Sequence, residues 1–237
     1  MPNILQRHRN KLIAAVVVVL LAVVGGPFVY INFIKEDPPE RLTLDDVPAS
    51  AGDATSTTGD GESLEGIDGT WKIGEDSVAG YRVPETLFGQ STEAVGRTSD
   101  VSGTLVIEGT TVTAVDIEVD MTTIESDEDK RDGQFQGRIM DTEQFPTATF
   151  TLTQPIVLGA PPDEGVKITA SAVGDLTIRG VTKSVTIELT AVRQDGGLAV
   201  DGDIELNFDD FEIPDASNQV ASVGRTGELE LLLVFTR

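Results

Sequence analysis

Two groups of acidic residues in the chain have a spacing that could support chemistry. The first, Asp127, Glu128, Asp129 and Asp132, is followed by Gly133 and at first resembles a calcium loop. An EF-hand loop needs oxygen ligands at fixed positions, and basic residues stand here at the third-ligand position and at that of the bidentate glutamate. We therefore interpret this group as the solvated start of a helix.

The second group is the pair Asp209 and Asp210 with Glu212 nearby. Paired carboxylates can hold a cation or act as the acid and base of a glycosidase. Since no other feature marks a sugar site, a charged loop is the simpler interpretation.

The residue types needed for most other catalytic sites are missing from the folded part of the chain. There is no cysteine, and the single histidine, His8, lies close to the N-terminus. This composition excludes a thiolate nucleophile, a Ser-His-Asp triad and histidine-ligated zinc or iron. No glycine-rich phosphate loop and no GxSxG motif occurs. We expect a non-catalytic protein that needs no metal and no other cofactor.

Charge is distributed unevenly along the chain. All 40 acidic residues, but only 14 of the 17 basic ones, follow position 34. Such an acidic remainder argues against nucleic acid as a partner, because phosphate binding needs clustered Lys and Arg. It also argues against a domain that lies flat on anionic lipid. The charge is more simply explained by solubility.

An uncharged apolar run covers residues 12–34 and follows a basic tip at residues 1–11. As a helix, its 23 residues extend about 34 Å, enough to cross a bilayer. The run is longer than the core of a cleaved signal peptide, which is the alternative, and no Ala-x-Ala site closes it. The positive-inside rule places the tip in the cytoplasm and the remainder outside. We therefore expect a single-pass protein of the cytoplasmic membrane.

Residues 35–68 are rich in Asp, Glu, Pro, Gly, Ser and Thr. Such a segment buries too little apolar surface to offset its ordering entropy, so we expect a flexible linker. Its root-mean-square reach is about 30 Å. The domain that follows, residues 69–237, could stand away from the membrane or return to it.

Apolar residues alternate with polar ones at several places after position 69. Val115, Ile117 and Val119 alternate with acidic residues, and the same period of two occurs in KSVTIELTAV and at the start of ELELLLVFTR. This period predicts strands, and Gly180-Val181-Thr182 reads as a hairpin turn between two of them. Many short strands favour an all-β sandwich or a closed barrel.

One stretch, residues 124–146, has too many charges and glycines for a strand. Ser126 followed by Asp129 is typical of a capped helix start, and acidic residues fit the first turn. We expect one or two short helices that end before Pro146 and cover one end of a barrel.

Several motifs together resemble the YceI-like domain family, which is named for polyisoprenoid binding. They are Trp71-Lys72-Ile73 with Ser77, the stretch MTTIESDEDKRDGQFQGRIMDTEQFPTATF, the hairpin GDLTIRGVTKSVTIEL and the closing NFDDFEIPDASNQVASVGRTGELELLLVF. The resemblance spans residues 69–237. Family members often carry a histidine beside the serine and after the Arg131-Asp132 pair. This chain has no histidine at either position, so the resemblance does not extend to a headgroup contact through them.

The resemblance implies an eight-stranded antiparallel, lipocalin-like barrel with short helices at one end. It also implies a non-catalytic function, the binding of an isoprenoid or similar amphipathic lipid, such as a quinone, inside the barrel. Seven apolar residues are the predicted lining: Met121, Phe135, Ile139, Phe145, Phe150, Ile178 and Phe208. The alternative is a filled barrel that serves as an accessory subunit of a membrane complex, in which the partner is another protein.

Overall fold

The computed structural model describes residues 38–47, 66–159, 163–194, 196–219 and 221–237. The predicted basic tip, the predicted membrane span and most of the predicted linker lie outside these residues. Within the described ranges, no helix is both long and apolar enough to cross a membrane. The location of the protein and its anchor therefore stay predictions.

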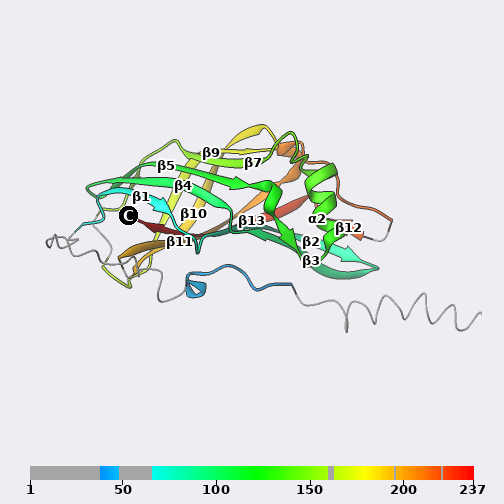
Figure 1. Ribbon diagram of the computed structural model, residues 1–237, viewed down its shortest axis with the longest axis horizontal. Coiled ribbons are helices and arrows are strands. Elements are labelled where there is room, and N and C mark those ends of the chain that lie inside the picture. The colour runs from blue at the N-terminus through cyan, green and yellow to red at the C-terminus, as the bar shows by residue number, and fades with distance from the viewer. Residues whose placement is uncertain (1–37, 48–65, 160–162, 195, 220) are drawn as a thin grey trace, which may run out of the picture. The chain divides into compact units, whose positions relative to one another are not determined.

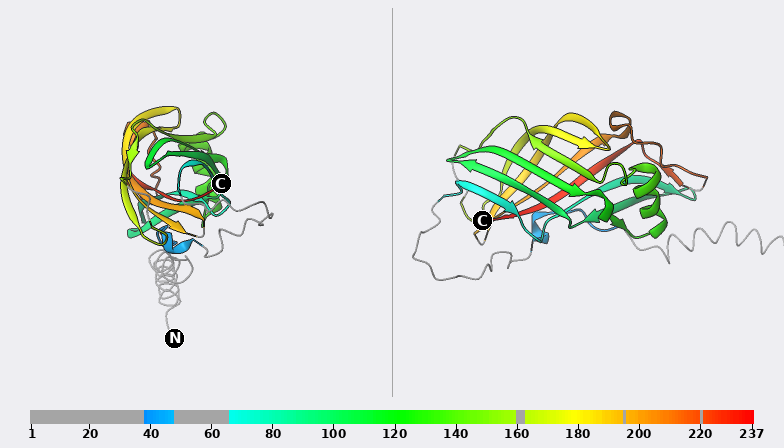
Figure 2. Two further views of the ribbon diagram at one scale, coloured as in Figure 1. Left: turned by 90° about the vertical axis from the view of Figure 1, so that its left-hand side faces the viewer. Right: turned by 45° about the horizontal axis from the view of Figure 1, so that its top comes forward.

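Eight antiparallel strands close into a barrel, which settles the choice between sandwich and barrel (Figures 1 and 2). Each strand pairs with the next around the ring, and β13 returns to β1. In ring order, the strands are β1 (Gly69–Ile73), β4 (Val101–Glu108), β5 (Thr111–Asp120), β7 (Thr147–Leu152), β9 (Ile168–Ile178), β10 (Val181–Gln194), β11 (Gly197–Asn207) and β13 (Thr226–Thr236).

A hairpin extends the wall beside β13. The C-terminal end of β13 pairs with β1, whereas its first half pairs with β2 (Val78–Leu87), which in turn pairs with β3 (Gln90–Thr98). Three shorter strands complete the sheet: β6 (Glu125–Ser126) on β3, β8 (Ile156–Val157) on β5 and β12 (Ala221–Val223) on β2.

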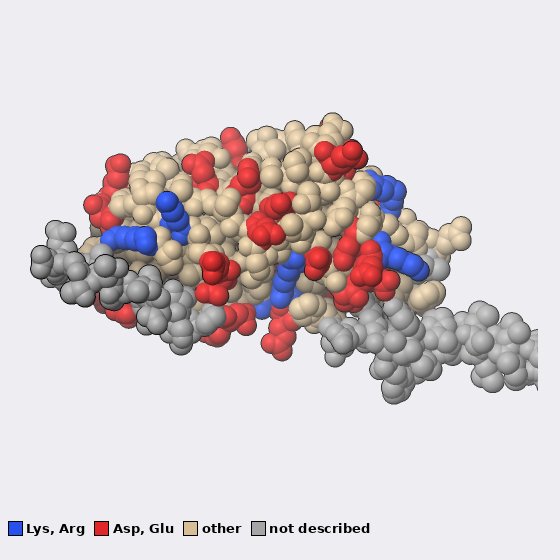
Figure 3. Space-filling view, viewed as in Figure 1, with Lys and Arg blue, Asp and Glu red and all other residues tan. Residues whose placement is uncertain are grey.

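The alternation along β5 has the predicted orientation. Val115, Ile117 and Val119 pack against the apolar interior, while Asp116 and Glu118 are exposed. Figure 3 shows acidic side chains spread over this side of the molecule, with few basic ones among them. The acidic composition is thus a property of the outer surface of the barrel.

The predicted hairpin joins β9 to β10, but its turn lies one residue earlier than predicted. Ile178 pairs with Val181, so the turn consists of Arg179 and Gly180. Both have positive φ, 52° and 76°, as a two-residue turn of this hand requires. Val181 and Thr182 therefore already belong to β10. A two-residue turn of this type is favoured because its backbone twist matches the twist of the two strands.

One short helix, α2 (Asp129–Gln134), continues into a π-helical turn at Phe135–Ile139. Single 3-10 turns occur at Leu44–Asp46, Met121–Thr123 and Phe208–Phe211. Figure 1 places α2 at one end of the barrel, far from the C-terminus. The predicted helical segment is confirmed.

The predicted cap of this helix is wrong. The helix begins after Glu128, which makes no side-chain cap, and Ser126 lies in β6 instead. The Ser126 amide and hydroxyl both donate to Asp132 Oδ1, at 3.0 and 2.5 Å. The carboxylate of the helix thus binds the strand before it, an arrangement that holds α2 against β3 through β6.

Candidate functional site

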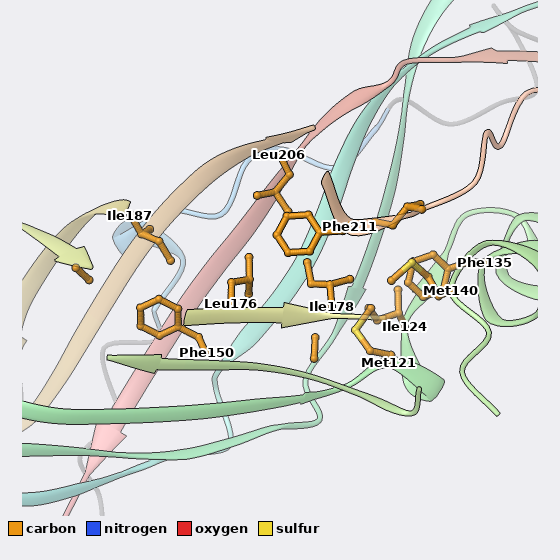
Figure 4. Packing of buried hydrophobic residues seen from close by; sticks show 13 residues of the cluster. Met121, Ile124, Phe135, Met140, Phe150, Leu176, Ile178, Ile187, Leu206 and Phe211 are labelled. Atoms are coloured by element: carbon orange, nitrogen blue, oxygen red, sulfur yellow. The ribbon is translucent and has the colours of Figure 1, made fainter. Parts of the chain in front are cut away.

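Apolar side chains fill much of the barrel beside α2, and we call this group the α2-end cluster (Figure 4). It draws on the helical segment, on β7, β9, β10 and β11, and on the 3-10 turns that follow β5 and β11. Its buried members are Met121, Ile124, Phe135, Met140, Ala148, Phe150, Ala172, Leu176, Ile178, Ile187, Leu206, Phe211 and Ile213.

Many other apolar side chains pack against this cluster yet remain partly accessible. On β10, Val185 and Leu189 keep some exposure although Ile187 between them is buried. Ile204 on β11 and Ile117 on β5 behave in the same way. These inward-facing side chains are therefore intermediate in exposure and not fully buried.

A glycine makes room for one large ring in the cluster. Gly174 on β9 lies under Phe150, so close that a Cβ at Gly174 would come within 2.4 Å of the ring. It would also come within 2.6 Å of the carbonyl oxygen of Thr151. The missing side chain thus leaves room for the Phe150 ring over the backbone of β9.

The opposite half of the barrel, which we call the Trp71 end, has a second apolar cluster. Trp71 is 2% exposed, and its Nε1 donates to the Ile67 carbonyl oxygen at 2.8 Å. The Arg237 guanidinium covers the indole ring at 4.2 Å from its centroid. The buried members of this group are Ile67, Trp71, Leu105, Ile107, Val112, Leu198, Leu233 and Phe235. Other apolar side chains, such as Ile73, Val101 and Val200, pack against this group and stay partly accessible.

Polar groups lie between the α2-end cluster and the helix. The rings of Tyr81 and Phe135 stack, with centroids 5.1 Å apart and planes 15° apart. Burial raises the pKa of the Tyr81 phenol far above its ordinary value, and the charge of Arg131 opposes this only in part. The hydroxyl therefore stays protonated at neutral pH and can donate a hydrogen bond.

Glu85 on β2 follows Tyr81 on the same face of the strand. It is 9% exposed, and its carboxylate lies 3.4 Å from Arg131 Nη2. Arg131 also forms an ion pair with Asp127. A guanidinium, two carboxylates and a phenol thus meet where β2 passes under α2. This group differs in character from the apolar cluster beside it.

The acidic groups singled out by the sequence have structural partners. Asp209 forms an ion pair with Arg225, and Asp132 accepts the two hydrogen bonds from Ser126. Within the described ranges, no three His, Cys, Asp or Glu side chains gather closely enough to hold a metal ion. Asp132 lies in α2, in agreement with the helix start predicted for the first group, and Asp209 and Asp210 lie in the 3-10 turn Phe208–Phe211.

A model of the YceI-like domain matches residues 71–235 of this chain. The chain belongs to the YceI-like family. The match covers the eight barrel strands except the first two residues of β1 and the last residue of β13. The predicted anchor and linker lie outside it.

Solved structures show the same fold. One is a polyisoprenoid binding domain from Saccharophagus degradans implicated in plant cell wall breakdown, with a TM-score of 0.57 and 15% identity over 70% of this chain and 97% of that one. Another is BcnA from Burkholderia cenocepacia, with a TM-score of 0.51 and 17% identity over 69% and 95%. No curated protein matches the sequence.

Six of the seven predicted lining residues come together in this YceI-like barrel. Met121, Phe135, Phe150 and Ile178 are buried members of the α2-end cluster. The side chains of Ile139 and Phe208 pack against it and stay partly accessible. Residues far apart in the sequence thus meet in one apolar interior.

Phe145 is the exception, since it is not part of the cluster. Its ring lies against the β9–β10 turn, 5.7 Å below the Arg179 guanidinium. A Cβ at Gly180 would come within 2.6 Å of that ring. The glycine that forms the turn therefore also provides the contact surface for Phe145. Sequence alone does not reveal such a contact, because it joins two separate loops.

Sequence reasoning did not name the polar residues at this end of the barrel, nor most of the partly accessible lining. Val185 and Leu189 stood in a recognised alternating strand, so their inward orientation was predictable. Tyr81 and Glu85 gave no such signal, because β2 carries a proline and two charges among its apolar residues. The pairing of β2 with β13, in which Tyr81 lies opposite Leu229, determines their position in the barrel wall.

Ser77, part of the motif that resembles the family, has a structural role. It is fully buried, and its hydroxyl accepts from the Val234 amide at 2.9 Å and donates to the Val234 carbonyl at 3.3 Å. It thus pairs the polar backbone of β13 at the point where β1 and β2 diverge.

Replacing this serine, Ser77→Ala, should lower the free energy of unfolding by about 1–3 kcal/mol, because it leaves a buried backbone amide unpaired. Denaturant titration followed by Trp71 fluorescence measures the loss. Ser102→Ala on β4 is the matched control, since Ser102 is exposed and its loss should change little. Equal stability of both variants would contradict the structural role.

Proposed function

We propose that this protein binds the chain of an isoprenoid or similar amphipathic lipid in the half of its barrel beside α2. The observation that carries the proposal is the set of inward-facing apolar side chains that remain partly accessible there. They include Val185, Leu189 and Ile204. A soluble domain rarely leaves such surface unfilled without a ligand to cover it.

The energetics of this site favour an apolar chain. Burial contributes about 25 cal/mol per Å² of apolar surface removed from water. A chain of several isoprene units buries a few hundred Å², so the gross gain is several kcal/mol before the cost of association. Because the ion-paired groups of Glu85, Arg131 and Asp127 lie at the α2 end, we propose that the chain enters beside α2 and the headgroup stays there.

The polar group under α2 suits a headgroup. Tyr81 offers a hydroxyl donor beside the stacked ring of Phe135, and Arg131, paired with Glu85 and Asp127, lies near that hydroxyl. A quinone ring presents carbonyl acceptors and a flat face, which match this donor and this ring. A quinone is thus the amphipathic ligand that we propose to fit best.

The alternative function, a filled barrel that acts as an accessory subunit, has less support. The match to the YceI-like family, and the polyisoprenoid binding domain among the solved structures with this fold, are the reason to prefer a binding protein. Catalysis has no support in the described site, which combines an apolar interior with paired carboxylates.

Lipid extraction tests the proposal directly. The full-length protein is purified from membranes in mild detergent, and native mass spectrometry is combined with analysis of the extracted lipid. We expect close to one isoprenoid-tailed molecule per barrel. Delipidated protein should then bind an isoprenoid alcohol more tightly than a straight-chain alcohol of equal length. A barrel that carries no lipid and takes up neither alcohol would overturn the proposal.

A further inference from the structure

Residues 39–47, which we call the strap, lie along the outer wall of the barrel, although this stretch was expected to be part of a flexible linker. The strap contains the 3-10 turn Leu44–Asp46 and crosses the outer side of β13 and β11. Figures 1 and 2 show it as the blue segment beside the barrel.

An apolar contact fixes the middle of the strap. Leu44 is 5% exposed and packs on Val192, Ala199 and Leu232, which are themselves 3–5% exposed. These three side chains point outward, because their neighbours Leu198 and Leu233 belong to the interior of the Trp71 end. The wall thus presents an apolar patch where a barrel surface is normally polar, and Leu44 covers it.

Hydrogen bonds hold the backbone of the strap at both ends. The carbonyl oxygen of Pro39 accepts from Arg82 Nη2 at 2.8 Å, and that of Glu40 accepts from Arg97. Further along, the Leu44 amide donates to Asp201 Oδ2 at 3.2 Å. Arg82 is only 4% exposed, so the Pro39 carbonyl provides a partner that water could not easily replace.

Ion pairs also join charged residues of the strap to oppositely charged residues of the barrel wall. Arg41 pairs with Glu228, and Asp45 pairs with Lys167 at 3.3 Å. A positive residue of the strap thus meets an acidic part of the wall, and a negative residue meets one of the few lysines. These exposed pairs contribute little stability, but they fix the direction of the strap.

The direction has a consequence for a tethered barrel. The strap begins beside β2 and β3, the hairpin that carries Tyr81, and it continues toward the start of β9, which Lys167 precedes. Five peptide steps separate Ile34, the last residue of the predicted span, from Pro39. Fully extended, they reach at most about 18 Å. The full linker of residues 35–68 would give about 30 Å on average.

We propose that the strap sets the orientation of the barrel, holding the α2 half next to the membrane so that a lipid passes between bilayer and interior over a short distance. This inference rests on the proposed function and on the predicted anchor.

Labels at the two ends of the barrel test the orientation. The chain has no cysteine, so Ser91→Cys on β3 and Lys72→Cys on β1 give single labelling sites, both exposed. Full-length protein is reconstituted into phosphatidylcholine vesicles that carry a headgroup spin-label quencher. We expect the fluorophore at position 91 to be quenched at least twofold more than that at position 72. Equal quenching at both sites would overturn the inference.

Undocking the strap should remove this difference. Leu44→Asp places a carboxylate on the apolar patch beside Asp201, and the quenching ratio should fall toward one. Val157→Asp introduces the same charge at a side chain that is 74% exposed on β8, so the ratio should stay unchanged. A ratio that persists in Leu44→Asp would contradict the role of the strap.

Two further measurements keep the outcomes distinct. If Leu44→Asp does not fold, hydrogen exchange of the unaltered protein decides, since the Leu44 amide should be protected and free exchange there would overturn the docking. Lipid content is measured on the same samples. Bound lipid with equal quenching contradicts the orientation alone, whereas unequal quenching without lipid contradicts the proposed function alone.

Discussion

Replacing Glu230 with alanine is expected to lower the free energy of unfolding by about 3–5 kcal/mol, because it removes a buried carboxylate that the guanidinium groups of Arg82 and Arg97 share. Glu230 is 3% exposed, although it points out of the barrel wall on β13. One carboxylate oxygen binds Arg82 Nε, and the other lies 2.9 Å from Arg97 Nη2. Arg82, 4% exposed, keeps only the Glu93 carboxylate when Glu230 is removed.

Glu228→Ala provides the matched control on the same strand and face. Glu228 is 29% exposed and pairs with the exposed Arg41, so its loss should cost less than about 1 kcal/mol. Urea unfolding of full-length protein in mild detergent, followed by the fluorescence of the single tryptophan, Trp71, measures both variants. The prediction fails if the two variants unfold within 1 kcal/mol of one another.

This buried charge network also shows which structural features the sequence pattern does not predict. Glu228 and Glu230 occupy alternate positions on β13, a pattern typical of a solvent-facing side. The alternation correctly predicted which way they point. It could not predict that residues 39–47 cover Glu230, because their polar composition indicates disorder when considered alone. Burial on the outside of a barrel depends on a contact between segments nearly 190 residues apart.

The interior was easier to predict than the wall. Period-two patterns identified the inward residues of β5 and β10, and family resemblance added the strand number and the closure of the barrel. Phe145 was placed inside because it lies among apolar residues of the helical segment, yet its ring packs on the Arg179-Gly180 turn. Local composition indicates that a residue is buried, whereas the partner that buries it depends on the tertiary fold.

Val185→Trp is expected to lower the affinity for an isoprenoid alcohol at least tenfold while leaving the stability of the barrel nearly unchanged. Val185 faces inward across from Gly174 and is only partly buried, so a larger side chain should occupy the space that a ligand would use. A tenfold change corresponds to about 1.4 kcal/mol of binding free energy.

The same variant separates the binding protein from a filled barrel. In a filled interior, the added ring would overpack the core and cost about 1–3 kcal/mol of stability. Thr186→Trp is the control, since Thr186 is the next residue on β10 and is exposed on the outer surface. Titration of delipidated protein with the alcohol, alongside urea unfolding, gives both quantities. Lost affinity with retained stability requires open space beside Val185, whereas lost stability without a change in affinity means that side chains already fill it.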